Sequence, residues 1–169
     1  MVFPLHEALL SNDADEVKRL IKSGVDVDEE RSGFSALYSV VSSLHHGALA
    51  YAQLLLREGA DPNKMQGKTL AVRTTLGLAV GHDLTDIVDL LLKYGADVNS
   101  AYALHISSIR CKTAITRMLI TYGGDVKLTD PSGELPIDVL ESYLAFLQNS
   151  GNPPIDEEIV LEMRQLLAV

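Results

Sequence analysis

The stretch Leu91-Leu92-Lys93-Tyr94-Gly95-Ala96-Asp97-Val98-Asn99 sets the pattern of the whole chain. Similar stretches begin at Leu20, Leu55 and Leu119, and each has a glycine after an apolar run and an Asp two residues later. The four glycines are Gly24, Gly59, Gly95 and Gly123. Their spacings of 35, 36 and 28 residues indicate a repeat protein.

Each of these stretches predicts the end of a helix followed by a turn. Glycine adopts the left-handed conformation that closes a helix without steric cost. An Asp two residues later can accept a hydrogen bond from its own following backbone and start a turn. A shorter helical segment precedes each stretch or follows the last one: Pro4–Leu10, Ser35–Leu44, Thr75–His82, Ala103–Arg110 and Pro136–Leu147. We therefore expect units of helix, tight turn, helix and loop.

Composition narrows the class of protein. The 169 residues are 47% apolar and include no Trp, so we expect one aliphatic core. A net charge of −9 argues against nucleic-acid binding, which needs clustered positive charge. A single cysteine, Cys111, excludes an internal disulfide and a multi-cysteine zinc site, and favours a reducing compartment. With no long apolar run and no secretory leader in the sequence, we expect a cytoplasmic protein that binds no membrane; the nucleus and delivery into a host cell stay open.

Several stretches resemble the Thr-Pro-Leu-His-x-Ala start of the ankyrin repeat. They are Phe3-Pro4-Leu5-His6-Glu7-Ala8, Ser35-Ala36-Leu37-Tyr38, Thr74-Thr75-Leu76-Gly77-Leu78-Ala79, Tyr102-Ala103-Leu104-His105 and Leu135-Pro136-Ile137-Asp138. The hairpin phrase of that family is similar to Asp130–Leu135 and, more loosely, to Glu30–Ser35. The resemblance covers residues 1 to about 148 and implies an all-α solenoid with short β-hairpin fingers. It also implies that His6 and His105 tie neighbouring loops together.

The resemblance implies five units in one domain. We expect an N-terminal capping unit over residues 1–28, internal units over 29–63, 64–99 and 100–127, and a C-terminal capping unit over 128–169. The second unit has a longer inter-helix turn and the third a longer finger between Gly67 and Thr74. The fourth is short enough for its finger to be missing or reduced to a turn. A final helix is expected near Asp156, where three acids suit a helix N-terminus.

Candidates for chemistry are weak. Gly67-Lys68-Thr69 lacks the upstream glycine and the strand of a phosphate-binding loop. His45 and His46 point in different directions on a helix, so they do not predict a metal site. Arg110 and Lys112 flank Cys111 and could lower its thiol pKa, yet no base can be placed beside it. Paired acids fall in loops and helix starts. We expect no catalytic residue, cofactor or metal. Asn63 and Asn99 resemble asparagines that some ankyrin proteins present to a hydroxylase.

The resemblance implies a protein-binding surface on the finger tips and the exposed ends of the first helices. Its candidate residues are Arg31, Ser32, Phe34, His45, His46, Met65, Gln66, Lys68, Arg73, His82, Arg110 and Tyr143. Phe34, Met65 and Tyr143 are the candidate anchors, although Phe34 could instead pack under its own hairpin. Two stretches contain cations but no acid, with histidine left out of the count. Residues 62–82 contain Lys64, Lys68 and Arg73. Residues 98–124 contain Arg110, Lys112 and Arg117.

Those two stretches predict that a partner protein or peptide with an acidic segment binds the central units. The chain is then a monomeric, non-catalytic scaffold or adaptor. The alternative is a regulatory or inhibitory subunit that occludes or positions a partner enzyme.

Overall fold

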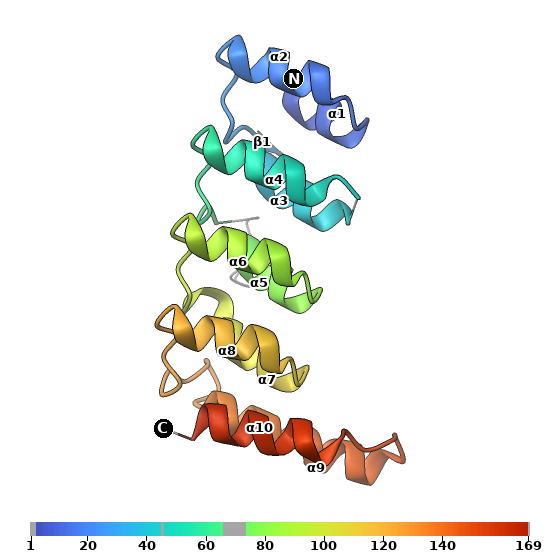
Figure 1. The fold of residues 1–169 in the computed structure, drawn as a ribbon, viewed down its shortest axis with the longest axis vertical. Helices are drawn as coiled ribbons and strands as arrows, with labels where there is room; N and C mark the ends of the chain where they lie inside the picture. Colours follow the sequence, from blue (N-terminus) through green and yellow to red (C-terminus); the bar gives the residue numbers. More distant parts are fainter. Residues whose placement is uncertain (1–2, 45, 66–73, 169) are drawn as a thin grey trace.

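A computed structural model describes residues 3–44, 46–65 and 74–168. Within these residues the chain forms ten α-helices, one two-stranded sheet and one short 3₁₀ turn. The helices pair in sequence order, and the pairs stack along one axis with the two termini at opposite ends (Figure 1). This arrangement confirms the all-α solenoid with short hairpins that the sequence predicts. No helix of the described residues is long and apolar enough to cross a membrane.

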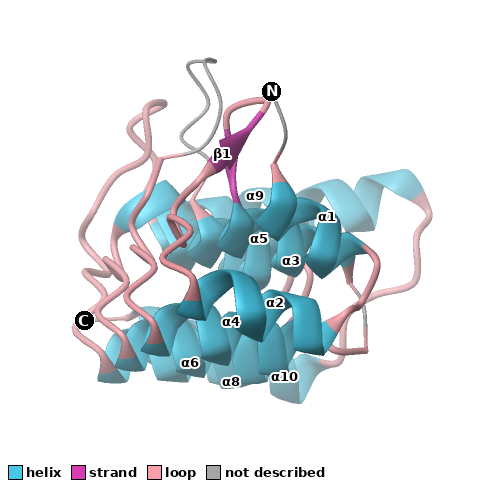
Figure 2. Ribbon diagram, turned by 90° about the horizontal axis from the view of Figure 1, so that it is seen from above, coloured by secondary structure: helices cyan, strands magenta, loops and turns pink. Residues whose placement is uncertain are grey.

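The two helices of each pair belong to two separate layers (Figure 2). The first helices are α1 (Pro4–Leu10), α3 (Ala36–Ser43), α5 (Thr75–Gly81), α7 (Ala103–Ile109) and α9 (Pro136–Ser150). The second helices are α2 (Ala14–Lys22), α4 (Ala48–Arg57), α6 (Thr85–Lys93), α8 (Thr113–Thr121) and α10 (Glu157–Leu167). Each first helix therefore has first helices of other units as its neighbours, and this layer carries the fingers.

Local sequence explains where the first helices begin. Pro4 and Pro136 stand at the first helical position, where a missing N–H costs nothing. Ser35 and Thr74 cap α3 and α5, and their hydroxyl oxygens accept from the N–H groups of Tyr38 and Gly77 at 3.2 and 3.1 Å.

The second helices end as the repeated stretch predicts. Gly24, Gly59, Gly95 and Gly123 have φ angles of 85°, 97°, 85° and 88°. In each case the N–H of the next residue donates to the carbonyl of the leucine four residues before the glycine, at 2.9 to 3.2 Å. These bonds satisfy carbonyls that the helix end would otherwise leave unpaired.

The core is aliphatic and runs the length of the stack. One leucine from the start of each of the first four first helices is at most 4% exposed: Leu5, Leu37, Leu76 and Leu104. The leucines before the glycines, Leu55, Leu91 and Leu119, are fully buried against them from the other layer. A separate cluster of Leu140, Met163 and Leu167 holds the last pair. Small side chains thus fill the space between the layers without any Trp.

Consecutive loops are joined by a repeated hydrogen bond. In each loop the Asp after the glycine accepts from the N–H two residues on, as expected, at 2.8 to 3.0 Å. The residue two after that Asp then accepts from the Asp N–H of the next unit. Asp28 does so for Asp61 at 3.1 Å, Asn63 for Asp97 at 2.7 Å, and Asn99 for Asp125 at 2.8 Å. The asparagines that resemble hydroxylase targets thus serve as spacers between units.

The fingers differ from unit to unit. β1 (Glu30–Arg31) and β2 (Phe34–Ser35) pair antiparallel in the second unit, with Arg31 opposite Phe34. In the fourth unit a 3₁₀ turn, η1 (Ser100–Tyr102), stands in place of the finger, as its length predicts. α9 runs three residues beyond the expected end at Leu147. The last helix begins where the acids predicted it, and the Asp156 carboxylate accepts from the Glu158 N–H at 2.8 Å.

Candidate protein-binding surface

The hairpin of the second unit holds three of the expected binding residues. Ser32 and Gly33 have φ angles of 57° and 83°, so they form the two-residue turn that suits the twist of a hairpin. Arg31 and Ser32 are exposed at this tip, whereas Phe34 is half-buried. The Phe34 ring stacks on Tyr38 of α3, with centroids 5.2 Å apart and planes 23° apart. Phe34 thus supports its own hairpin and presents only part of its ring.

The third finger is described only at its start. Met65 is 58% exposed there, which suits an anchor for a partner. The expected residues Gln66, Lys68 and Arg73 lie outside the described residues, as does His45 of the second unit.

A second group of expected residues lies where the first helices end. His82 and Arg110 directly follow α5 and α7, at equivalent positions of two consecutive units, and both are exposed. Ile109, beside Arg110, is 38% exposed. Tyr143 has the equivalent position in the last unit, but α9 continues past it and it is half-buried. His46 is exposed in the lengthened turn before α4.

The fingers and the inter-helix turns lie at opposite ends of the first helices. A seven-residue helix such as α5 is about 10 Å long, so the finger group and the turn group are separated by about that distance. The expected residues therefore do not form one cluster. They form two edges of the layer of first helices, with the exposed faces of those helices between them (Figure 2).

Ion pairs neutralise several of the cations that suggested an acidic partner. The ammonium of Lys64 lies 3.3 Å from a carboxylate oxygen of Glu30. The ammonium of Lys112 lies 2.5 Å from Asp83. Arg117 lies on α8, in the layer of second helices, and donates to Glu162 of α10 at 2.5 Å. Within the described residues, Arg31 and Arg110 form no ion pair. Among the expected binding residues that the structure describes, these two are the cations left for a partner.

Sequence reasoning missed exposed leucines along the turn edge. Leu44 is 52% exposed after α3, and Leu49 is 39% exposed in α4. Leu44 also has a φ of 52°, in the left-handed region that Asn12, Asp83 and Cys111 occupy in the other turns. Leu44 and Leu49 help to line a groove of about 420 Å³ that reaches the start of α6. The sequence feature that could have revealed this groove is an apolar residue in a turn, where polar residues are usual.

The histidines at two of the repeat starts, His6 and His105, have the structural role that the resemblance implies. The Nε2 atom of His6 lies 3.1 Å from the carbonyl oxygen of Phe34, and that of His105 lies 3.0 Å from the carbonyl of Glu134. Each ring thus joins a first helix to the finger of the following unit. Both residues are at most 5% exposed.

The pKa of the Cys111 thiol is shifted in the direction opposite to the one that its flanking cations suggested. The half-buried thiol lies in the turn between α7 and α8, and burial raises its pKa above the ordinary value. The charge of Lys112 lowers the pKa by a smaller amount. On balance the turn raises the thiol pKa, so the flanking cations do not make Cys111 more acidic than an ordinary cysteine. Among the residues described, no three His, Cys, Asp or Glu side chains are grouped so as to hold a metal ion.

Comparison with known proteins gives consistent matches. Residues 73–102 match the ankyrin repeat family model. An ankyrin repeat protein of fowlpox virus (strain NVSL) is 28% identical over 118 residues, which are 69% of this chain and 19% of that protein. A second fowlpox ankyrin repeat protein is 30% identical over 141 residues, covering 78% of this chain and 41% of that protein. The B-cell lymphoma 3 protein homolog of Mus musculus is 31% identical over 121 residues, covering 69% of this chain and 27% of that protein.

The chain spans between a fifth and two fifths of the length of these relatives. Together, the family match, these relatives and the stacked helix pairs show that the chain belongs to the ankyrin-repeat family.

Proposed function

We propose that residues 1–169 form one non-catalytic array that binds a partner protein through the exposed layer of first helices. Ankyrin repeats are general protein–protein interaction modules, and proteins of this family are typically non-catalytic. In this chain the array acts as a monomeric scaffold or adaptor in the cytoplasm, where a single free thiol stays reduced.

The observation that carries the proposal is the pair Arg31 and Arg110. Both guanidinium groups are exposed and form no ion pair with a described residue, whereas other cations nearby are bound to acids. A free guanidinium binds carboxylates with two parallel hydrogen bonds. The two arginines lie on the finger edge and the turn edge, so an acidic segment that crosses the first helices meets both.

Exposed apolar side chains give this surface its contact area. Met65, Leu44 and Ile109 lie on the same two edges and are 58%, 52% and 38% exposed. Apolar and arginine side chains supply most of the energy of protein interfaces, while the surrounding polar contacts exclude water. The favoured partner is therefore an acidic segment that also carries apolar residues.

The test is affinity capture with a double variant. Arg31→Ser with Arg110→Ser removes both free guanidinium groups, while Arg19→Ser with Arg57→Ser removes two exposed arginines of the second helices that pair with Glu16 and Glu58. Circular dichroism checks that all forms stay helical. We expect the first double variant to capture at least about tenfold less of the partner protein than wild type does, and the second to capture as much as wild type. Titration of the purified partner against all three forms then gives the affinities.

Equal capture by both double variants would show that Arg31 and Arg110 do not contribute to partner binding. Enzyme assays of the captured protein distinguish a scaffold from an inhibitory subunit, because only the latter changes the turnover of its partner.

A further inference from the structure

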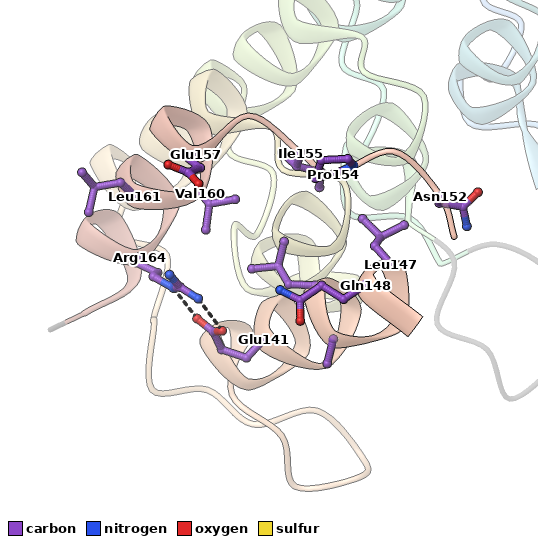
Figure 3. Close-up of a pocket in the computed structure, with 12 residues that line it drawn as sticks. Glu141, Leu147, Gln148, Asn152, Pro154, Ile155, Glu157, Val160, Leu161 and Arg164 are labelled. Atoms are coloured by element: carbon purple, nitrogen blue, oxygen red, sulfur yellow. Dashed lines mark hydrogen bonds and ion pairs between the residues drawn. The ribbon is translucent and has the colours of Figure 1, made fainter. Parts of the chain in front are cut away.

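The last helix pair contains a groove between its two helices. α9 and α10 are joined by a loop that runs through Gly151, Pro153 and Pro154 instead of a tight turn. Pro cannot continue a helix, so the loop separates the two helix ends. The space between α9, the loop and α10 measures about 920 Å³ and is shown in Figure 3.

Apolar side chains make up seven of the twelve residues that line the groove. Leu144 and Leu147 come from α9, Ile155 from the loop, and Val160 and Leu161 from α10. Leu161 is 56% exposed, so a large leucine side chain stands in water at the rim. Beside it, the half-buried side chains of Leu144, Ile155 and Val160 leave further apolar surface open to a partner.

The charge around this groove is strongly negative. Residues 128–169 contain eight acids and one cation, a net charge of −7 within a chain of −9. The one cation, Arg164, donates to both carboxylate oxygens of Glu141 at 2.6 and 2.8 Å (Figure 3). This bond holds the pKa of Glu141 below its ordinary value. Glu157 also lines the groove and forms no ion pair with any residue that the structure describes.

We propose that the groove between α9 and α10 binds an amphipathic helix that carries Lys or Arg on both sides of an apolar stripe. Leucines at i, i+3, i+4 and i+7 of such a helix fill the apolar floor, as in other helix-in-groove complexes. Its cations meet the carboxylates around the rim. α9 is about 22 Å long, so about 14 residues of a guest helix can lie along it.

Charge disfavours the competing occupants. A second copy of this chain, an acidic peptide and a nucleic acid each bring negative charge to a unit that is already at −7. The groove is thus complementary to a different class of partner from the one that suits Arg31 and Arg110. With two surfaces of opposite preference, the array can hold two partners at once, and this second surface does not depend on the first.

A designed peptide tests the groove directly. The probe is a fluorescein-labelled peptide of about 14 leucine and lysine residues, with leucine at helical spacing. One control peptide has the same composition with leucine and lysine in strict alternation, and another has glutamate in place of lysine. Fluorescence anisotropy measures the affinity of each for the full chain.

Matched variants locate the site. Leu161→Arg places a cation in the groove, whereas Leu10→Arg makes the same change at a leucine of similar exposure at the other end of the array. We expect Leu161→Arg to lower the affinity for the helical probe at least about tenfold. Leu10→Arg should change that affinity less than about twofold. Glu157→Gln should weaken it by about threefold at low salt, and less at high salt.

Several results would overturn the proposal. They are equal binding of the alternating peptide, equal effects of the two arginine variants, and no saturable binding of the helical probe. Analytical ultracentrifugation covers the remaining occupant: a wild-type dimer that Leu161→Arg converts to a monomer would assign the groove to a second copy. Circular dichroism of each variant confirms that α10 is still folded.

Discussion

The Nδ1 atom of His6 lies 3.2 Å from Oε1 of Glu29, a residue of the following unit. The same carboxylate oxygen accepts from the backbone N–H groups of Leu5 and His6 at 3.0 and 3.2 Å. Phe3 precedes α1 and has no side-chain oxygen to cap it. Glu29 therefore caps the first helix of the array from the second unit, and so couples the folding of the two units.

Removing this cap should destabilise the N-terminal unit. We expect Glu29→Ala to lower the free energy of unfolding by about 1–3 kcal/mol, because it leaves two partly buried N–H groups unpaired. Glu29→Gln keeps an acceptor oxygen and should lose less. Urea unfolding followed by far-UV circular dichroism measures both. Glu58→Ala, at an exposed acid that only pairs with Arg57, should change stability by less than about 0.5 kcal/mol. A similar loss in that control would contradict the capping role.

The asparagine spacers should contribute to stability through their side-chain amides. Asn63 accepts from the Asp97 N–H at 2.7 Å and donates to the Gly95 carbonyl at 2.9 Å, so it makes two bonds to the third unit. We expect Asn63→Ala to cost about 1–2 kcal/mol in urea unfolding, and Asn63→Asp to cost less because it keeps the acceptor. Asn149→Ala, at an exposed position of α9, serves as the control and should not destabilise. No loss in Asn63→Ala would mean that water replaces both bonds.

Gly77 holds the place that His6, Tyr38 and His105 have in other units. A Cβ added there would lie 2.7 Å from the Cβ of Ala101, in the 3₁₀ turn that replaces the fourth finger. A glycine in α5 thus makes room for the shortened neighbour. We expect Gly77→Ala to destabilise by about 1–3 kcal/mol, although alanine usually stabilises a helix.

Two further variants separate this clash from helix propensity. Gly81→Ala meets no atom within 4 Å and should stabilise slightly. Ala101→Gly removes the clashing methyl group and relieves a φ of 51°, so it should restore the stability of Gly77→Ala. Thermal unfolding of the single and double variants gives the coupling energy. If Ala101→Gly leaves the loss unchanged, the contact is not its cause.

Sequence alone predicted the features that depend on nearby residues. The glycine-ended helices, the Asp turns and the start of α10 follow from neighbours within about one helical turn. The roles of His6 and His105 followed from the family resemblance. Even the loss of the fourth finger follows from a count of residues between Asn99 and Ala103.

The electrostatic surface could not be predicted in the same way. Lys112 and Asp83 are 29 residues apart, and Arg117 and Glu162 are 45 apart, so only the stacking of units shows that they pair. The groove at the C-terminal end depends on how far the loop through Pro153 and Pro154 separates two helices. The residue types determine the charge of the last unit, but the depth of its groove depends on how the two helices pack.

The Cys111 thiol should titrate at a higher pH in the folded chain than in the unfolded chain, because burial raises its pKa. A group whose folded pKa is raised adds stability below its unfolded pKa, near 8.5, and this stability is lost as the pH rises through the folded value. Wild type should therefore lose more stability than Cys111→Ser between about pH 8 and pH 10. Tyr51, whose pKa burial also raises, is present in both forms, so their difference isolates the thiol.

Alkylation rates give a second measurement of the same group. Iodoacetamide should modify the folded chain more slowly than the chain in urea at about pH 8, because less thiolate is present. Lys112→Ala removes the charge that opposes the effect of burial, and should slow the reaction further. Faster modification of the folded chain would show that the thiol is activated, contrary to its surroundings in the turn between α7 and α8.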